Sequence, residues 1–294
     1  MTVHIIAEIG VNHNGDLSLA KQLIEQAKFV GADAVKFQTW ITEDIIEKNA
    51  NKAEYQKTNN SNSESQYEML KNLEFSFSEF EYLKSYCDEI GIEFLSTPDD
   101  INCANFLYPL QDKFKIGSGE IDNLLFLKKI AKLGKPVILS TGISDLEEVQ
   151  QALNSLEEGG LQKSQITLMH VTSDYPAAYS EVNLNAMITM KNIFKCPIGY
   201  SDHTKGIEVA IAAVSLGAII IEKHFTLDRN LEGPDHKASL MPKEFKMMVE
   251  SIRNIEKSLG SGKKLPTPSE LWNKEIIRKK IFYKSSFSKG HKLV

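Results

Sequence analysis

Cysteine is scarce in this sequence, with three residues among 294. Cys87, Cys103 and Cys196 are odd in number, widely spaced and without a C-x-x-C pair, which argues against a disulfide framework and a thiolate metal site. Long apolar runs are also missing, because no stretch approaches the roughly 20 residues of a membrane-spanning helix. A secretion signal has a basic region followed by an apolar run, and the first residues of this sequence contain neither. We therefore expect a cytoplasmic protein that does not enter a membrane.

Positive charge is not in excess either. The 34 Lys and Arg residues stand against 39 Asp and Glu residues, and the formal net charge is −5. Basic residues do not gather into a run of three before Arg278, Lys279 and Lys280, so the sequence lacks the electrostatic footprint of a nucleic-acid-binding protein. A phosphate group, if one is bound, must be bound locally. With 42% hydrophobic residues, the chain can bury a large core, either as one α/β barrel or as two smaller domains.

Short apolar runs typical of strands alternate with amphipathic segments typical of helices. The expected strands are 3–9, 33–38, 92–96, 113–116, 136–140, 165–170, 197–200 and 218–222. The expected helices are 17–30, 78–90, 101–108, 124–132, 145–158, 184–193, 206–215 and 242–259. Eight such units predict a parallel sheet that closes into a (β/α)8 TIM barrel. An open doubly wound sheet is the alternative, although no G-x-G-x-x-G follows the first strand.

Two stretches depart from this alternation. Residues 39–76 form a polar connection, and so long a connection inside a compact domain is either functional or disordered. We expect a lid over a site, with a flexible insertion as the alternative. From residue 263 on, the composition is typical of a linker that leads to a short segment. The expected domains are therefore a catalytic barrel over 1–262 and a separate segment over 263–294.

Two histidines follow two successive strands of the predicted barrel. His203 comes after the strand 197–200 and His224 after the strand 218–222, with a helical segment between them. If these strands are parallel neighbours, both imidazoles lie at the same edge of the sheet. Imidazole suits Zn, Mn, Fe, Co and similar ions, but two histidines are too few to name the metal. The alternative is that each is a structural histidine.

Polar side chains follow almost every expected strand, at the barrel end where chemistry takes place. They are Glu8, Lys36, Gln38, Ser96, Thr97, Lys115, Ser118, Glu120, Ser140, Thr141, His170, Thr172, Ser173, Tyr175, Ser201, His203, Glu222 and His224. Two lysines and several hydroxyls suit a small phosphate ester that carries a carboxylate. Glu8 and Glu120 are candidates to position or deprotonate a water molecule. These residues predict a metal-assisted reaction on an anionic phosphorylated substrate.

Eight blocks in this order resemble the sialic acid synthase family, which includes N-acetylneuraminate synthase and its legionaminate and pseudaminate relatives. The blocks are AEIGVNHNG (7–15), KFQT (36–39), STP (96–98), GSGE (117–120), LSTG (139–142), GYSDHT (199–204), IEKHFT (221–226) and GPDH (233–236). The resemblance covers nearly the whole chain. It implies condensation of phosphoenolpyruvate with the open-chain aldehyde of an N-acetylated hexosamine, which gives a nine-carbon keto acid and phosphate.

The resemblance also implies roles for individual residues. His203 and His224 would hold a divalent metal, Mn or Mg, and Glu8 would act on the metal-bound water molecule. Glu120 remains a catalytic candidate from its place at a strand end. Phosphoenolpyruvate would be bound by Lys36, Thr97, Lys115, Ser118, Ser140, Ser173 and Ser201. The sugar would be bound by Gln38, Tyr175 and Asp235.

The chain departs from the family pattern in several places. GSGE stands where members usually have PSGE, STPDD stands for STPFD, and Ser173 replaces an Asn or Thr. In the family a small antifreeze-like domain follows the barrel and contributes an arginine to the partner's sugar site in a domain-swapped dimer. Residues 278–294 resemble only the linker and the first turn of that domain. We therefore expect a homodimer only where this domain is present or supplied.

Two other functions stay open at this point. A barrel that binds sugar or phosphoenolpyruvate without turnover is disfavoured because the histidine pair, Glu8 and both lysines are kept. A metal-dependent hydrolase is disfavoured because no H-x-H follows the first strand and no third ligand is obvious. The motifs do not distinguish N-acetylmannosamine from a 2,4-diacetamido-6-deoxy analogue as the sugar.

Overall fold

Eight parallel strands form one sheet, as the alternation of apolar and amphipathic segments predicts. The computed structural model describes residues 2–48 and 65–292. The strands are β1 (His4–Gly10), β2 (Ala34–Thr39), β3 (Glu93–Pro98), β4 (Phe114–Ile116), β5 (Val137–Ser140), β6 (Ile166–Val171), β7 (Ile198–Asp202) and β8 (Ile220–His224). Their hydrogen-bonded order is β3-β2-β1-β8-β7-β6-β5-β4, and β3 packs beside β4. The predicted (β/α)8 barrel is confirmed.

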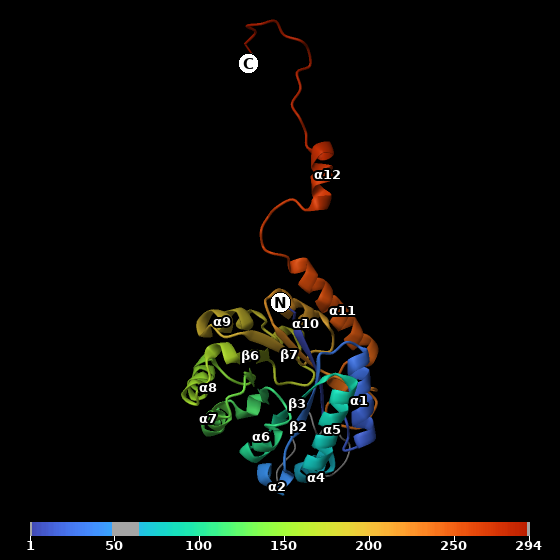
Figure 1. Cartoon of the computed structure of the whole chain (residues 1–294), viewed down its shortest axis with the longest axis vertical. Helices are drawn as coiled ribbons and strands as arrows, with labels where there is room; N and C mark the ends of the chain where they lie inside the picture. The colour runs from blue at the N-terminus through green and yellow to red at the C-terminus, as the bar shows by residue number, and fades with distance from the viewer. Residues whose placement is uncertain (1, 49–64, 293–294) are drawn as a thin grey trace. The chain divides into compact units, whose positions relative to one another are not determined.

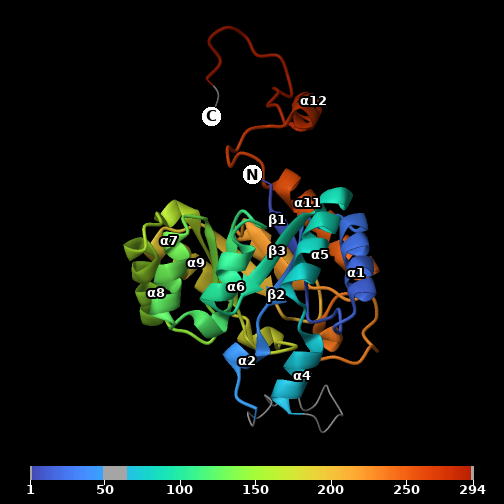
Figure 2. The same ribbon diagram turned by 60° about the horizontal axis from the view of Figure 1, so that its bottom comes forward.

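Helices surround the strands on the outside of the barrel (Figures 1 and 2). Among the described residues, the helices of the barrel unit are α1 (Leu17–Phe29), α2 (Thr42–Ile45), α4 (Gln66–Leu73), α5 (Phe77–Ile90), α6 (Ile101–Leu107), α7 (Leu124–Lys132), α8 (Leu146–Glu158), α9 (Asn185–Phe194), α10 (Glu208–Ser215) and α11 (Pro242–Leu259), and α12 (Pro268–Ile277) belongs to a separate unit. Short 3-10 turns are η1 (Ser118–Glu120), η2 (Lys163–Gln165), η3 (Tyr179–Glu181) and η4 (His236–Ala238). No helix among the described residues is long and apolar enough to cross a membrane.

Local sequence signals fix where the helices begin and end. Ser76 and Glu79 form a reciprocal capping box at the start of α5, and Asp145 and Glu148 do the same for α8. Gly91 ends α5 in the left-handed conformation with a φ of 75°, which a residue without Cβ adopts at little cost. These residues determine where α5 and α8 begin and where α5 ends. The chain can therefore turn from α5 into β3 within a few residues.

The chain divides into two compact units, Met1–Ser258 and Leu259–Val294. The first unit holds the barrel. The second contains α12, which starts with a capping box between Thr267 and Glu270 and buries none of its residues. The stretch expected to be a linker thus includes a helix.

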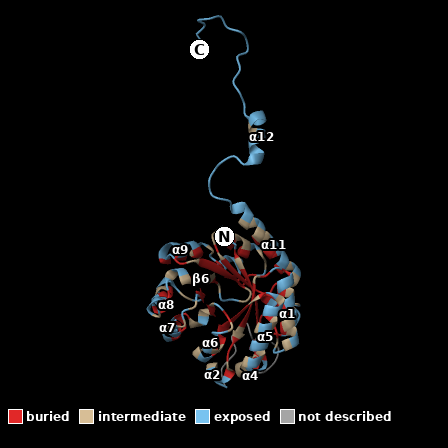
Figure 3. Ribbon diagram, viewed as in Figure 1, coloured by how far each residue is buried: buried red, intermediate tan, exposed pale blue. Residues whose placement is uncertain are grey.

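The barrel interior changes from apolar to polar along the strands. Its lower layer is a small apolar cluster of Ile6, Ala34, Leu95, Ile138, Met169 and Ile220. Two positions further along five of these strands, on the same face, are Glu8, Lys36, Thr97, Ser140 and Glu222, which are all buried. Figure 3 shows that the buried residues follow the strands, while the outer faces of the helices are exposed. The polar layer therefore lies on an apolar floor that keeps water out from below.

The connection between β2 and α5 is more ordered than a plain polar loop. Residues 39–76 include α2 and α4, and α4 is started by a capping box between Ser65 and Glu68. Met69 and Leu73 of α4 pack with Val11 and Trp40, which follow β1 and β2. The part of the expected lid over residues 49–64 lies outside the described residues.

A side-chain amide joins β3 to the segment before β4, where no ladder of backbone hydrogen bonds pairs the two strands. The buried Gln111 accepts a hydrogen bond from the Ser96 N–H at 2.7 Å and donates one to the Ser96 carbonyl at 3.1 Å. One glutamine thereby satisfies both backbone groups of a buried strand residue. It takes the place of the missing ladder at the point where the barrel closes.

We expect Gln111→Leu to lower the free energy of unfolding by about 2–6 kcal/mol, because two buried backbone groups lose their partner at about 1–3 kcal/mol each. Urea unfolding followed by circular dichroism measures this change. Gln22→Leu on the exposed face of α1 is the matched control, with an expected change within about 0.5 kcal/mol. Equal effects of the two substitutions would contradict the closing role of Gln111.

Candidate active site

Glu8 and Lys36 form a buried ion pair at the carboxyl ends of β1 and β2. Their register places them opposite each other, and the Lys36 Nζ lies 2.5 Å from the Glu8 Oε2. Lys36 also donates to the Thr97 hydroxyl at 3.1 Å, and Gln38 donates to the Glu8 Oε1 at 3.1 Å. Gly10 leaves the space that this requires, because a Cβ there would lie 2.2 Å from the Glu8 Oε1. Four of the predicted site residues are thus brought together.

A second buried ion pair crosses the barrel from β4 to β8. The Lys115 Nζ donates to the Glu222 Oε1 at 3.1 Å, and the Ser201 hydroxyl donates to the same oxygen at 3.1 Å. Glu222 had no role predicted beyond its place at a strand end. The sequence did contain an indication that Glu222 belongs to the site: Glu222 and His224 are two residues apart, so they lie on the same face of the strand. The Glu222 Oε2 is buried without a hydrogen-bond partner in the described structure.

The two carboxylates of this cluster differ in their affinity for a proton. Burial raises the pKa of Glu8 from its ordinary 4.5 to about 7, against the opposing charge of Lys36 and with the help of the Glu222 carboxylate. For Glu222, burial is outweighed by Lys115 and Lys36, which lower its pKa to about 2. When two neighbouring carboxyl groups differ this much in pKa, one can carry a proton and the other stays ionised. Glu8 is the group that exchanges a proton near neutral pH, and Glu222 stays charged.

His203 and His224 lie side by side, with their ring centroids 5.3 Å apart. The His203 Nδ1 is 2.7 Å from the carbonyl oxygen of Thr172. The Tyr175 ring stacks on His203 at 4.1 Å and meets His224 edge-on at 5.4 Å. The Asp235 Oδ2 lies 3.6 Å from the His224 Nδ1. The structure therefore groups the two histidines with two of the three residues predicted to bind the sugar.

Both imidazoles are held in the neutral form that binds metals. Burial lowers the pKa of His203 to about 4, and burial together with His203 holds the pKa of His224 well below 6.5. The carbonyl next to the His203 Nδ1 is the usual partner of a metal-bound imidazole, because it fixes the tautomer. Across the described residues, no group of three or more His, Cys, Asp or Glu side chains is arranged around a common metal position. The histidine pair fits two ligands of a divalent metal, with other positions left to water or substrate.

Hydroxyl groups from neighbouring loops converge on Gly142, which follows β5. The Gly142 N–H donates to the Ser118 hydroxyl at 3.0 Å. A Cβ at Gly142 would lie 2.2 Å from the Ser173 Oγ and 2.7 Å from the Ser118 Oγ, so both hydroxyls point over this glycine. Ser140 is buried two residues earlier, at the end of β5. These serines form the donor-rich side of the barrel mouth.

Glu120 does not join the charged cluster. Its carboxylate accepts a hydrogen bond from the Asn123 side chain at 2.8 Å in the turn after β4, and no hydrogen bond or ion pair in the described structure links it to Glu8. Asp99, which has no predicted role, follows β3 nearby. Burial raises the pKa of Asp99 to about 7, with a further contribution from the charge of Glu120. The signal for Asp99 was that it stands where the family pattern has Phe.

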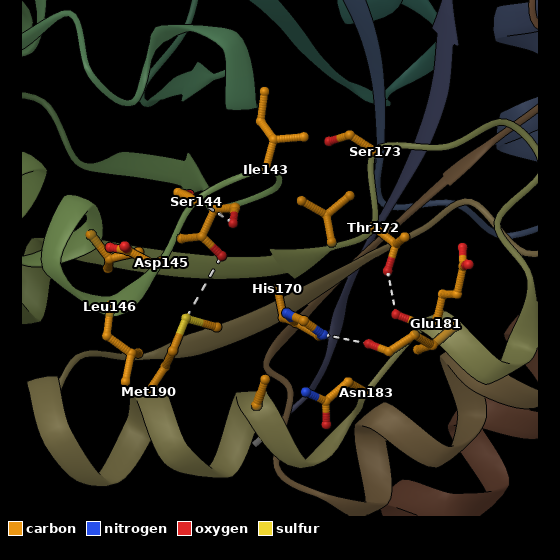
Figure 4. A pocket seen from close by; sticks show the side chains of 15 residues that line it. Ile143, Ser144, Asp145, Leu146, His170, Thr172, Ser173, Glu181, Asn183 and Met190 are labelled. Atoms are coloured by element: carbon orange, nitrogen blue, oxygen red, sulfur yellow. Dashed lines mark hydrogen bonds between the residues drawn. The ribbon is translucent and has the colours of Figure 1, made fainter. Parts of the chain in front are cut away.

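A cavity of about 640 Å³ opens beside this site, between the loops that follow β5 and β6 (Figure 4). It shares Ser173 with the site, and Val171, Val182 and Met190 form its apolar floor. Most of its polar groups are already bonded within the chain; for example, the His170 Nε2 lies 2.7 Å from the carbonyl oxygen of Val182. The lining of this cavity contains no lysine or arginine, whereas Lys36 and Lys115 lie in the charged cluster of the barrel.

Known proteins have sequences similar to nearly the whole of this chain. A model described as the NeuB family matches residues 23–264. An N,N'-diacetyllegionaminic acid synthase of Campylobacter jejuni is 51% identical over 287 residues, which cover 97% of this chain and 86% of that protein. A second N,N'-diacetyllegionaminic acid synthase, from Legionella pneumophila, is 48% identical over 99% of this chain and 82% of its own length.

A solved structure agrees with the fold. The crystal structure of an N-acetylneuraminic acid synthetase from Leptospira borgpetersenii, in complex with citrate, superposes with a TM-score of 0.82. The two sequences are 38% identical, and the match covers 94% of this chain and 91% of that one.

We expect the proton on Glu8 to give the stability of the protein a distinct pH dependence. The unfolded chain releases this proton near pH 4.5, whereas the folded protein keeps it up to about pH 7. Unfolding therefore releases a proton between these pH values, and the free energy of unfolding falls as the pH rises through this interval. For one proton the slope is up to about 1.4 kcal/mol per pH unit. Glu8→Gln should lack this component.

Urea unfolding at several pH values from 4.5 to 7 measures the two slopes. Glu81→Gln on the exposed face of α5 is the control, because it removes one carboxyl group from the surface and should keep the wild-type slope. A Glu8→Gln slope equal to that of wild type would show that Glu8 carries no proton in the folded protein.

Proposed function

This chain belongs to the NeuB family, and we propose that it is a nonulosonic acid synthase that condenses phosphoenolpyruvate with the open-chain aldehyde of an N-acetylated hexosamine. The products are a nine-carbon 2-keto acid and inorganic phosphate. The observation that carries this proposal is the combination of two buried lysines and a proton-carrying glutamate with a neutral histidine pair at one end of the barrel.

Phosphoenolpyruvate fits the side of the mouth where the lysines and hydroxyls lie. It carries a phosphate and a carboxylate, and both need cationic or N–H and O–H donors. Lys36 and Lys115 supply the charge, with Thr97 bonded to Lys36 and Ser201 bonded to the partner of Lys115. The hydroxyl groups that would donate hydrogen bonds to phosphoenolpyruvate are those of Thr97, Ser118, Ser140, Ser173 and Ser201.

The sugar fits next to Glu8 and the histidine pair. Gln38 contacts Glu8, Asp235 lies beside His224, and Tyr175 covers both histidine rings. The three residues proposed to bind the sugar thus each lie next to a residue proposed to act on its aldehyde. In the proposed arrangement, the aldehyde carbon lies between the histidine pair and Glu8 and faces C3 of phosphoenolpyruvate.

Glu8 would move the proton that the reaction requires. As C3 of phosphoenolpyruvate attacks the aldehyde carbon, the electron pair of the C=O double bond moves to the aldehyde oxygen, which takes up the proton carried by Glu8, and positive charge develops at C2. A water molecule then adds at C2 and gives a proton to the Glu8 carboxylate. Inorganic phosphate leaves as the bond between C2 and the ester oxygen breaks and the 2-keto group forms. A carboxyl group whose pKa lies near 7 can both release and accept a proton at neutral pH. Glu222, which stays ionised, holds Lys115 in place and stabilises the positive charge nearby.

His203 and His224 would hold a divalent metal, Mn or Mg. When bound, such an ion polarises a carbonyl oxygen as a Lewis acid. Because the His203 Nδ1 contacts the Thr172 carbonyl, the Nε2 is the nitrogen that would bind the ion, and it lies 3.5 Å from the Ser201 Oγ.

A 2,4-diacetamido-6-deoxy hexosamine is the sugar that we propose, ahead of N-acetylmannosamine. The two relatives at 51% and 48% identity are both named N,N'-diacetyllegionaminic acid synthases, and the products of such enzymes carry two acetamido groups.

The proposal is tested by release of inorganic phosphate from phosphoenolpyruvate with Mn²⁺ present. We expect release only when a sugar is added, and faster release with the diacetamido sugar than with N-acetylmannosamine. Phosphate release without any sugar would indicate a phosphatase instead. Binding of both substrates without release would indicate a barrel that binds them but does not turn over.

We expect Lys36→Met to raise the KM for phosphoenolpyruvate at least tenfold and the KM for the sugar little, because the lost charge faces the phosphate ester. Steady-state kinetics with each substrate varied in turn measures both constants. Lys28→Met, at the exposed end of α1, is the control and should change neither. A parallel rise in both KM values would assign Lys36 a structural role.

A further inference from the structure

A buried ion pair joins the outward faces of β7 and β8. The Lys223 Nζ lies 2.9 Å from the Asp202 Oδ2, and both side chains are fully buried. The two residues are direct partners in the register of the strands. Because side chains alternate along a strand, this pair points away from the barrel interior, while the residues before and after each of them point inward.

The same pair holds the residue that follows His203. The Asp202 Oδ1 accepts hydrogen bonds from the Thr204 N–H at 2.9 Å and from the Thr204 hydroxyl at 2.8 Å. Lys223 donates to the Thr204 carbonyl. His203 therefore sits between two residues whose positions are both fixed by one ion pair.

The separation of the two histidines depends on this arrangement. His203 follows β7 and His224 ends β8, so their distance is set by the register of the two strands at their last residues. The Asp202–Lys223 pair is the last paired position of that ladder. A shift of either strand would move one imidazole relative to the other, while the rest of the barrel could keep its packing.

Stability alone does not account for the pair. A buried ion pair loses the hydration of both charges, and replacing one with apolar residues of similar volume is often neutral or stabilising. The two charges are therefore better explained by the hydrogen bonds with which they fix Thr204 than by a gain in the stability of the core.

We propose that Asp202 and Lys223 are positioning residues that hold His203 at the distance from His224 required to share one divalent cation. This inference rests on the proposed function, because it assumes that the two histidines are metal ligands. Neither residue would touch the metal or a substrate.

The test is Mn²⁺ binding to the purified protein without substrates, measured by calorimetry. The double variant Asp202→Leu/Lys223→Met removes both charges together and keeps a filled core. Its urea midpoint should fall, because the buried Thr204 N–H and carbonyl lose their partners, so Mn²⁺ binding is measured without urea on protein that circular dichroism shows to be folded. Its dissociation constant for Mn²⁺ should rise by about tenfold to a hundredfold, as found for residues that orient metal ligands. Its dissociation constant for phosphoenolpyruvate should change much less than that for Mn²⁺, because Lys36, Thr97 and Lys115 lie on other strands and Ser201 is the one proposed phosphoenolpyruvate residue on β7.

Arg253→Met is the matched control. It breaks another ion pair, between Arg253 and Asp33 at 2.7 Å near the amino ends of the strands. This variant should lower the urea midpoint and leave the Mn²⁺ dissociation constant within twofold of wild type.

Two results would overturn the inference. Mn²⁺ binding by the double variant within twofold of wild type would do so while the proposed function stands. A wild-type protein that binds no Mn²⁺ would overturn it together with the proposed metal site.

If the double variant does not fold, Mn²⁺ binding is measured with Thr204→Val instead. This substitution removes the hydrogen bond from the Thr204 hydroxyl to Asp202 and keeps the ion pair. A loss of at least threefold in Mn²⁺ affinity supports the inference, and an unchanged affinity overturns it.

Discussion

Four alternating charges at the carboxyl end of the barrel are the constraint on which the site depends. Lys36 contacts Glu8 at 2.5 Å and Lys115 contacts Glu222 at 3.1 Å, and all four side chains are buried. In a medium of low dielectric constant, two cations tolerate burial only when anions balance them. An anionic substrate that takes over the lysines disturbs this balance. Glu8, whose pKa already lies near 7, is the group that can restore it by taking up a proton.

The barrel supplies the conditions for this balance. The apolar layer around Ile6 and Ile138 closes the interior below the charges, and the loops after the strands leave it open above. Of the two ion pairs, one joins neighbouring strands and the other crosses the barrel from β4 to β8. The cluster therefore forms only when the barrel is closed, which the Gln111 amide supports at the junction of β3 and β4.

The sequence predicted the barrel because period-2 and period-3.6 patterns alternate clearly, and it placed Glu8, Lys36 and Lys115 at strand ends because those ends are fixed by the same patterns. It did not predict that Lys115 meets Glu222, because 107 positions separate them and no local pattern records a contact across a barrel. Glu120 was assigned to catalysis from its position alone, whereas its side chain turns to Asn123. Which side chain turns inward after a strand depends on the loop, and that is set by tertiary contacts.

Proton uptake on binding of phosphoenolpyruvate tests this account most directly. Calorimetry at pH 8 in two buffers with different ionisation enthalpies gives the number of protons taken up per molecule bound. For wild type we expect a buffer-dependent heat that corresponds to uptake of up to one proton, because the substrate's charge raises the pKa of Glu8 further above 7. Glu8→Gln should bind without uptake. A wild-type heat that is the same in both buffers, or equal uptake in Glu8→Gln, would contradict the account.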